Sequence, residues 1–397
     1  MRHGWIEKAE NSKYASGIVV VAKKQSEDIR LCVNYKKVNS VTVLDPYPMA
    51  DIEDILAKIG SAKWISTVDM CKGYYAVPLE ESCRDITTFV TPWDAYRFKV
   101  LAFGLKNSGA VYARLLRKIL EGSKNMDNFV DDVISYNDTF EQHLVTLQDL
   151  FRRVRAAQIK IRPSKARFGY QKVEFLGHLI DGNSIRPTTE HIEKIVGAEP
   201  PKTKSGVKSV LGAIGFVRKF IPNCAAILKP LTELLAKNKP DHIEWSSRQQ
   251  IAFDKVKEIL TSEPVLRRYD VTKKHVIMSD ACDDAIGGVL LQEDEIGELH
   301  PVRYVSRKLL PREIRYPISQ KEALAVVFCI DKFYKYVYGS HFVLKTDCEA
   351  LAILNGKLSS NARIARWQLY LQTFNFTVEV VSGHENGLAD YCSRMYC

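Results

Sequence analysis

Hydrophobic and polar positions alternate along the first half of the chain in a pattern that predicts a mixed region of strands and helices. Short apolar runs bounded by polar turns indicate strands, whereas apolar residues spaced three and four apart indicate helices. The expected strands are 17–22, 29–33, 64–69, a hairpin over 85–100 and two short strands within 128–136. The expected helices are 49–59, 108–120 and 143–158.

The second half divides into a helical middle and a further mixed region. Residues 185–265 are expected to be mainly helical and are interrupted by prolines. Strands followed by alternating helices and strands are typical of a mixed α/β unit. The expected elements there are strands 275–279, 287–292 and 302–306, helix 319–336, strands 341–346 and 376–381, and a short helix 386–394.

The composition is that of a packed globular protein of two or three domains, with 397 residues, 46% of them hydrophobic and 26% charged. The longest apolar run, Ala323 to Ile330, is too short to span a bilayer, and no signal peptide is evident at the N-terminus. We therefore expect no membrane partner and an intracellular location, in the cytoplasm, in particles or in the nucleus.

Basic residues are concentrated in two stretches of a chain whose net charge is +10. The stretch from Arg152 to Lys172 contains eight basic residues and no acid, and the stretch between Glu199 and Glu233 contains six. Each alone is compatible with a solvated helix face. Two in succession, interleaved with aromatic residues, favour a track for a phosphate backbone.

Three aspartates form the first candidate site. Asp69 ends an apolar strand, and Asp131 and Asp132 occupy the tip of a predicted hairpin. Adjacent carboxylates between apolar flanks repel each other unless a cation offsets their charge. A solvent-exposed turn is the alternative, since Asp is a common turn residue.

Several motifs in this region resemble those of reverse transcriptases, and the pattern is most similar to gypsy-type LTR retrotransposon polymerases. Residues 129–132 resemble the aromatic-x-Asp-Asp box, and residues 68–74 resemble the first aspartate motif. The remaining similar segments are 103–108, the fingers hairpin from Lys23 to Tyr35, and the primer-grip turn 175–178. The resemblance implies a right-hand polymerase.

The resemblance also implies roles for individual residues. Asp69 and Asp131 would hold two Mg²⁺ ions, for which Mn²⁺ could substitute, while Asp132 would support the site. Tyr74 would exclude a ribose 2′-hydroxyl by its bulk, with a core aromatic as the less favoured alternative. Lys23 and Arg30 would hold the incoming triphosphate, and Leu176 and Gly177 would contact the primer.

Four acids of the last region form the second candidate site. Asp280 and Asp347 end strands, Glu322 lies on a helix, and Asp390 lies near a helix start. Each alone could be a helix cap or a surface acid. Together they resemble the metal-binding set of ribonuclease H domains, where two Mg²⁺ ions would activate water and stabilise the departing oxygen. His384 would assist product release or proton transfer, unless it is an ordinary loop histidine.

The resemblance extends to the middle of the chain, where Lys208, Arg218 and Lys219 accompany an apolar helical stripe. We expect a thumb that contacts the duplex backbone through these residues, although a plain helical packing module would look similar. The expected fold is α+β and α/β multidomain. Its domains are fingers and palm over 1–184, a helical thumb over 185–240, a connection or tether over 241–274, and a ribonuclease H-like mixed-sheet domain over 275–397.

The expected function is an RNA- and DNA-templated DNA polymerase with ribonuclease H activity. Its partners would be an RNA template, a DNA primer, RNA–DNA hybrid, dNTPs, and protease and integrase segments of a longer polyprotein. Two alternatives remain open: a degenerate or domesticated copy that binds nucleic acid without catalysis, and a nuclease whose polymerase half only holds the template.

Overall fold

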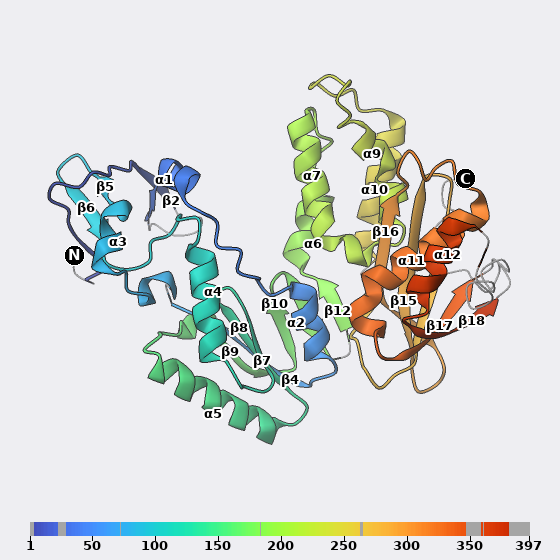
Figure 1. Ribbon diagram of the computed structural model, residues 1–397, viewed down its shortest axis with the longest axis horizontal. Helices are drawn as coiled ribbons and strands as arrows, with labels where there is room; N and C mark the ends of the chain where they lie inside the picture. The colour runs from blue at the N-terminus through green and yellow to red at the C-terminus, as the bar shows by residue number, and fades with distance from the viewer. Residues whose placement is uncertain are drawn as a thin grey trace. The chain divides into compact units, whose positions relative to one another are not determined.

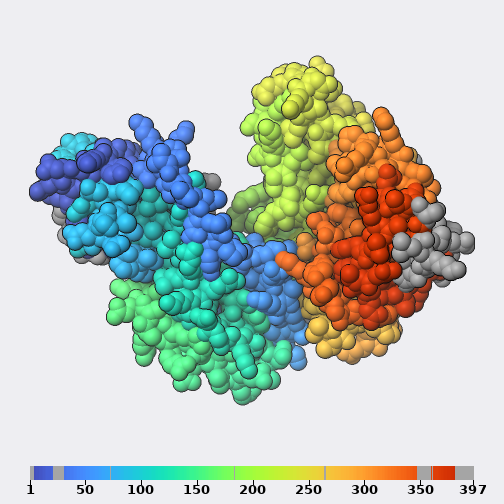
Figure 2. Space-filling view, in the orientation of Figure 1, coloured from blue at the N-terminus to red at the C-terminus, as the bar shows by residue number. Residues whose placement is uncertain are grey.

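The computed structural model describes residues 4–22, 29–71, 73–182, 184–262, 265–346, 359 and 361–380. The chain separates into two units, Met1–Val173 and Glu174–Cys397. Figure 1 shows their helices and strands, and Figure 2 shows the same chain as space-filling atoms. Of the helices within the described ranges, none is long and apolar enough to cross a bilayer.

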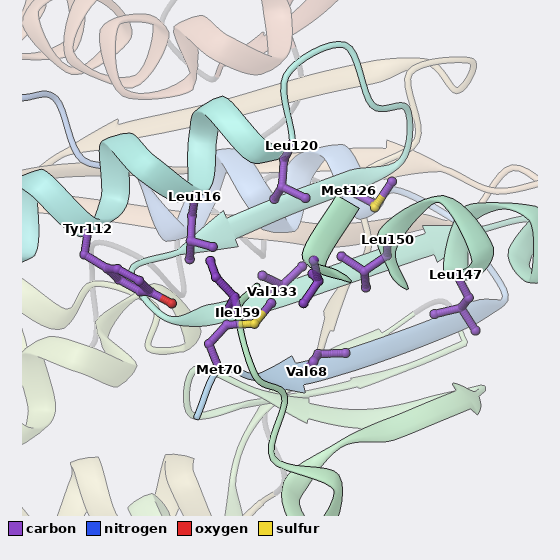
Figure 3. Close-up of a cluster of buried hydrophobic side chains, with 11 residues drawn as sticks. Val68, Met70, Tyr112, Leu116, Leu120, Met126, Val133, Leu147, Leu150 and Ile159 are labelled. Carbon is purple, nitrogen blue, oxygen red and sulfur yellow. The ribbon is translucent and has the colours of Figure 1, made fainter. Parts of the chain in front are cut away.

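The first unit contains a four-stranded antiparallel sheet in the order β7-β8-β4-β9. Its strands are β4 (Trp64–Asp69), β7 (Met126–Phe129), β8 (Asp132–Asn137) and β9 (Arg167–Tyr170). Helices α4 (Ser108–Ile119) and α5 (Phe140–Ala156) bury one face of it. Their shared core contains Val68, Tyr112, Leu116, Val133 and Leu150 (Figure 3). This packing fixes the strand ends that carry the first aspartates.

Smaller sheets and short helices complete the first unit. The hairpin β2 (Ile18–Ala22) and β3 (Ile29–Val33) forms as expected. A second sheet has the order β1-β6-β5. Its strands are β1 (Ile6–Lys8), β5 (Phe89–Val90) and β6 (Ala95–Phe98), and the short helices are α1 (Lys36–Val41), α2 (Ile52–Ile59) and α3 (Glu81–Arg84).

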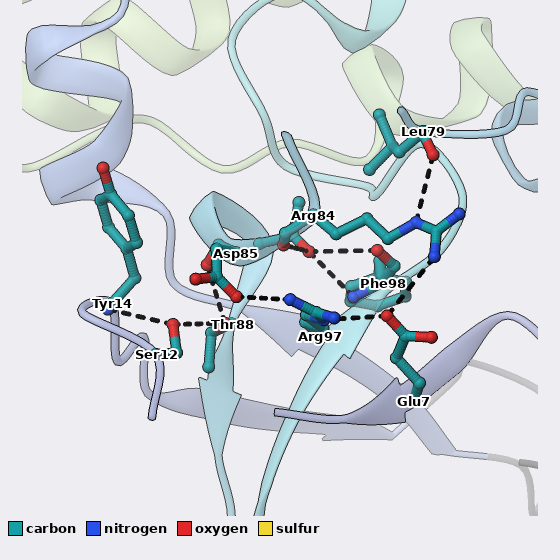
Figure 4. Close-up of polar contacts among 10 residues, drawn as sticks. Glu7, Ser12, Tyr14, Leu79, Arg84, Asp85, Thr88, Arg97 and Phe98 are labelled. Atoms are coloured by element: carbon teal, nitrogen blue, oxygen red, sulfur yellow. Dashed lines mark hydrogen bonds and ion pairs between the residues drawn. The ribbon is translucent and has the colours of Figure 1, made fainter. Parts of the chain in front are cut away.

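A polar network ties β1 to the rest of this small sheet (Figure 4). The Arg97 guanidinium donates to Glu7 Oε1 at 2.8 Å and to Asp85 Oδ1 at 2.7 Å. Arg84 Nη1 lies 3.5 Å from the same Glu7 oxygen. Because these charges are only partly buried, the network contributes mainly by holding β1 in register with β6.

Helix α5 begins three residues before its expected start at 143. Thr139 precedes the helix in an extended conformation, and its side chain accepts a hydrogen bond from Gln142 N. This cap satisfies a backbone donor that the first turn would otherwise leave unpaired. The amphipathic spacing alone did not reveal it, because the first turn contributes little to the buried stripe.

The second unit opens with a sheet of order β10-β11-β12-β13 and a helical module, which confirms the expected helical middle. The strands are β10 (Lys172–Phe175), β11 (His178–Asp181), β12 (Ser184–Pro187) and β13 (Leu266–Arg267). The helices are α6 (Thr189–Val196), α7 (Lys204–Val217), α8 (Cys224–Ile227), α9 (Lys229–Glu233) and α10 (Ser247–Thr261). Helix α10 packs on α9 through Phe253 and Leu231.

The second unit ends in a five-stranded mixed sheet of order β16-β15-β14-β17-β18. Its strands are β14 (His275–Ala281), β15 (Ala285–Glu293), β16 (Leu299–Lys308), β17 (His341–Thr346) and β18 (Asn375–Val380). Strands β14, β17 and β18 are parallel, whereas β14, β15 and β16 are antiparallel. Helix α11 (Ile318–Val337) packs on β14 and β15, and α12 (Ala362–Leu371) packs on α11. The expected mixed sheet is confirmed, and the expected helix 386–394 lies outside the described residues.

The helical module is joined to the mixed sheet by direct polar contacts. Arg218 Nη2 donates to the Ser306 carbonyl at 2.5 Å, and Ser306 Oγ accepts from Ala225 N at 3.0 Å. Lys229 forms an ion pair with Asp284, and Lys308 donates to Thr232 Oγ1. The helices therefore rest on β16 and on the turn that follows β14.

His143 is fully buried in the first unit and links three of its elements. Its Nδ1 lies 2.9 Å from Asn137 Oδ1, and its Nε2 lies 2.6 Å from Ser66 Oγ. Asn137 uses its amide nitrogen to donate to Thr146. This pattern assigns the ring proton to Nδ1, so Nε2 accepts from the serine hydroxyl in the neutral ring. Burial lowers the pKa of His143.

The neutral His143 ring makes stability depend on pH. Because the folded-state pKa lies below the unfolded value, the contribution is complete above the unfolded pKa and is lost as pH falls from there toward the folded pKa. Unfolding measured between pH 7 and pH 5 should therefore show falling stability, by at most about 1.4 kcal/mol per pH unit from this group. His143→Gln should flatten that dependence, whereas the exposed His341→Gln should not; equal slopes for both variants would contradict the assignment.

Candidate active site

The pairing of β4 with β8 brings the first aspartates together. Asp69 is the cross-strand partner of Asp132. The preceding pair, Val68 and Val133, points into the core, so by strand alternation Asp69 and Asp132 project from the opposite face. Asp131 lies in the turn between β7 and β8, and its carbonyl accepts from Met70 N at 3.2 Å. All three predicted carboxylates therefore meet at one end of the sheet.

The turn that carries Asp131 is strained. Val130 has a φ of 54°, a left-handed conformation that β-branched residues rarely adopt. Such a residue costs on the order of 1–3 kcal/mol and persists only where its surroundings hold it. Here the carbonyl of Val130 accepts from Asn128 Nδ2 at 3.4 Å, and both flanking strands are paired. The strain sets the direction in which the adjacent aspartate leaves the turn.

Asp132 lies in a partly buried place where negative charge accumulates. Burial raises its pKa to about 6, with further contributions from Asp131 and Asp69. Arg162 and Lys165 oppose this charge, each with its side-chain nitrogen 3.4 Å from Asp69 Oδ2. Both residues belong to the basic stretch 152–172, and their position beside the carboxylates was not expected from the sequence.

The residues present fit a hard divalent cation. All three donors are carboxylates, the ligands that Mg²⁺ prefers, and a bound cation would offset the charge that raises the Asp132 pKa. The oxygens of the three carboxylates do not all lie within 4.8 Å of one another. Over the described ranges, one group does meet that limit, formed by Asp294, Glu298 and His300. Asp294 already accepts hydrogen bonds from His300 and from the backbone of Ile296 and Glu298, so this group is a structural turn.

Tyr74 lies beside the aspartates and packs between two aromatic rings. Its ring centroid is 4.6 Å from that of Phe103 and 5.4 Å from that of Tyr112. Gly73 makes this packing possible, because a Cβ at this position would lie 2.2 Å from Tyr112 Cζ. Burial, followed by the charge of Asp131, raises the pKa of Tyr74. The ring is half-buried, so it is fixed by packing and still borders the aspartate site.

Tyr112 carries a hydroxyl that is buried with no hydrogen-bond partner in the described part of the chain. An unpaired buried hydroxyl costs about 1–3 kcal/mol. Tyr112→Phe should therefore raise the free energy of unfolding by about 1 kcal/mol, as measured by denaturant titration. Tyr136→Phe is the matched control, because the Tyr136 hydroxyl donates to Asp127 Oδ2 at 2.8 Å and its removal should destabilise. A loss of stability in both variants would contradict this account.

The turn between β10 and β11 places Leu176 and Gly177 in left-handed conformations, with φ of 46° and 75°. A Cβ on Gly177 would lie 2.7 Å from Phe216 Cζ and 2.9 Å from His191 Cε1. The rings of His191 and Phe216 stack at 4.6 Å. Helices α6 and α7 therefore press aromatic rings against this turn, a contact that the sequence did not reveal.

The second set of acids begins with a buried pair on neighbouring elements. Asp280 on β14 and Glu322 on α11 are 5% and 6% exposed. Ala281 and Ala325, which lie next to and one turn beyond these acids, share one apolar cluster. Gly288 allows the helix to approach, since a Cβ there would lie 2.5 Å from Cys329 Sγ and 2.4 Å from the Met278 carbonyl. Carboxylate oxygens again suit a divalent cation.

The structure describes only some of the other predicted site residues. Lys208 is exposed on α7, and Lys219 lies over the Phe220 ring at 5.3 Å. The Arg218 guanidinium donates to the Ser306 carbonyl, so the structure gives it a role within the second unit that the expected nucleic-acid contact did not include. Lys23, Asp347, His384, Asp390 and the side chain of Arg30 lie outside the described residues.

Comparison with known families identifies two domains. The family model described as "Reverse transcriptase (RNA-dependent DNA polymerase)" matches residues 21–180, and "RNase H-like domain found in reverse transcriptase" matches residues 245–344. Solved structures support the fold. The foamy viral protease-reverse transcriptase dRH in complex with ds DNA aligns with a TM-score of 0.85 at 22% identity, over 96% of this chain and 68% of that chain. The enzyme with RNA/DNA hybrid aligns with a TM-score of 0.78 at 23% identity, over 95% and 51%.

Relatives by sequence are retrotransposon polyproteins. The Pol polyprotein from transposon 297 of Drosophila melanogaster is 32% identical over 97% of this chain and 36% of its own length. The Tf2-3 polyprotein of Schizosaccharomyces pombe is 30% identical over 96% of this chain and 29% of its own length. The chain thus spans about a third of these relatives. The chain therefore contains a reverse transcriptase domain and an RNase H-like domain and is similar to retrotransposon Pol polyproteins, which confirms the expected fold and resemblance.

Proposed function

We propose that this chain is an RNA- and DNA-templated DNA polymerase with ribonuclease H activity, which copies retroelement RNA into DNA and degrades the RNA of the hybrid. The meeting of Asp69, Asp131 and Asp132 at one strand end carries the proposal. Asp69 and Asp131 hold divalent cations, Mg²⁺ or Mn²⁺ in its place, and Asp132 adds negative charge beside them. The bound ions supply stabilisation of the charge that develops during phosphoryl transfer.

The remaining residues position the substrates. Lys23 and Arg30 hold the triphosphate of an incoming dNTP, and Tyr74 lies under its sugar. Leu176 and Gly177 place the DNA primer, and exposed Lys208, with Lys219, contacts the backbone of the template–primer duplex. For Arg218 we propose support of the helical module, given its bond to Ser306. Asp280, Glu322, Asp347 and Asp390 hold the cations for hybrid cleavage, and His384 moves a proton or releases product.

The proposed organisation keeps fingers and palm over 1–184, thumb over 185–240, tether over 241–274 and an RNase H-like domain over 275–397. Protease and integrase segments of a longer polyprotein remain proposed partners, because the relatives are about three times longer than this chain. We propose that the protein acts inside the cell, in the cytoplasm, in particles or in the nucleus.

Substitutions in the two carboxylate sets should abolish separate activities. Loss of several kcal/mol of charge stabilisation predicts that Asp131→Asn lowers primer extension in Mg²⁺ by at least about 100-fold and spares hybrid cleavage. Asp280→Asn should do the reverse. The control is Asp138→Asn, an exposed aspartate just beyond β8 that should leave both activities intact.

Extension that survives Asp131→Asn would refute the polymerase assignment. A wild-type chain that binds primer–template but catalyses neither reaction would instead support the degenerate binding protein. Hybrid cleavage without any extension would support a nuclease whose polymerase half only holds the template.

Tyr74 should discriminate between sugars. Replacing its ring with a smaller side chain removes a steric barrier to the 2′-hydroxyl, so Tyr74→Val should raise ribonucleotide insertion relative to deoxynucleotide insertion by about tenfold or more. Tyr75→Val is the control, since Tyr75 shares the Phe103 contact but otherwise packs against Trp5 and stacks on Phe98. A similar change in both variants, or loss of folding in Tyr74→Val alone, would favour a purely structural ring.

A further inference from the structure

A basic cleft lies in the first unit, between α2, α4 and β7. Its volume is about 490 Å³, within the range typical of small-molecule sites. The side chains that decide its chemistry are Tyr47, Lys58, Arg114, Arg117, Lys118 and Asp127. They come from the segment before α2, from both helices and from β7, whose contacts with α2 and α4 place these elements side by side.

The cleft retains positive charge after its internal ion pairs are counted. Lys58 pairs with Asp127 at 2.6 Å, and Arg114 pairs with both oxygens of Asp45 at 2.9 and 2.7 Å. Arg117 and Lys118 are exposed, and neither has a carboxylate partner among the residues that the structure describes. Two cations on one helix turn are therefore available to an outside anion, against a single additional lining carboxylate, Glu121.

Tyr47 orders the arginines of the cleft. The guanidinium carbons of Arg114 and Arg117 lie 4.7 and 5.9 Å from the centre of its ring. Cation–π contacts of this kind restrict the arginine rotamers, which lowers the entropy that is lost when an anion binds.

Cations in the last turn of α4 also favour the helix dipole, and this alone could place Arg117 and Lys118 there. The helix dipole does not account for the other residues that line the cleft. Lys58 comes from a different helix, Tyr47 comes from a non-helical segment, and a cavity separates them.

We propose that this cleft binds phosphate groups. An arginine fork matches the geometry of phosphate oxygens, and a neighbouring lysine adds a point charge. The ligand is either a phosphate of a nucleic-acid strand that extends beyond the primed duplex or a free phosphate compound. The cleft is distinct from the aspartate site, although β7 borders both, since Asn128 lines the cleft and donates to the Val130 carbonyl.

The test measures binding by the full chain without divalent metal, so that neither proposed metal site takes up phosphate. Arg117→Gln combined with Lys118→Gln is compared with the wild type and with Lys124→Gln, an exposed lysine of the following loop that does not line the cleft. The probes are inorganic pyrophosphate, a blunt primer–template duplex and the same duplex with a long single-stranded overhang.

The double variant should bind pyrophosphate about tenfold more weakly, and Lys124→Gln should not change. If a strand is the ligand, overhang binding should also weaken and its log–log salt slope should fall by about 1.4 to 1.8, the value for two phosphate contacts. An effect on pyrophosphate alone would identify a free phosphate compound. Unchanged binding of pyrophosphate and of the overhang duplex would overturn the proposal, whatever the outcome for catalysis.

Discussion

The pairing of β4 with β8 is the constraint on which the candidate polymerase site depends. It sets Asp69 opposite Asp132 and leaves Asp131 in the adjoining turn. A shift of one residue would turn Val68 and Val133 out of the core and the aspartates into it. The apolar core beneath the sheet and the charge at its end are therefore fixed by the same register.

Local strain and unsatisfied groups are concentrated around this strand end. Val130 holds a left-handed conformation, Tyr112 buries a hydroxyl that has no hydrogen-bond partner among the described residues, and Asp132 has a pKa raised by burial and by its neighbours. Each feature opposes folding, and the packing of α4 and α5 offsets them. Such clustering is typical of functional sites, where stability is lost in favour of a fixed arrangement of charge.

The helices, the strands and the candidate aspartates could be predicted from the sequence, because strand and helix periodicity and motif order are local signals. Strand 64–69 and the hairpin with Asp131 and Asp132 form as expected. Contacts between distant segments were not predictable in this way. The bond from Arg218 to Ser306, the Phe216 ring against Gly177 and the ion pairs of Asp69 all depend on tertiary packing. The early start of α5 was missed because a single cap at Thr139 decides it.

The proposed polymerase site requires that Asp69 and Asp131 share the same cations. The most direct measurement is Mn²⁺ affinity by electron paramagnetic resonance, on primer–template complexes of an Asp280→Asn background that weakens the second site. Because both carboxylates hold the same ions, Asp69→Asn and Asp131→Asn should each lower affinity nearly as much as the double substitution. Additive effects, or no effect of either substitution, would contradict the claim.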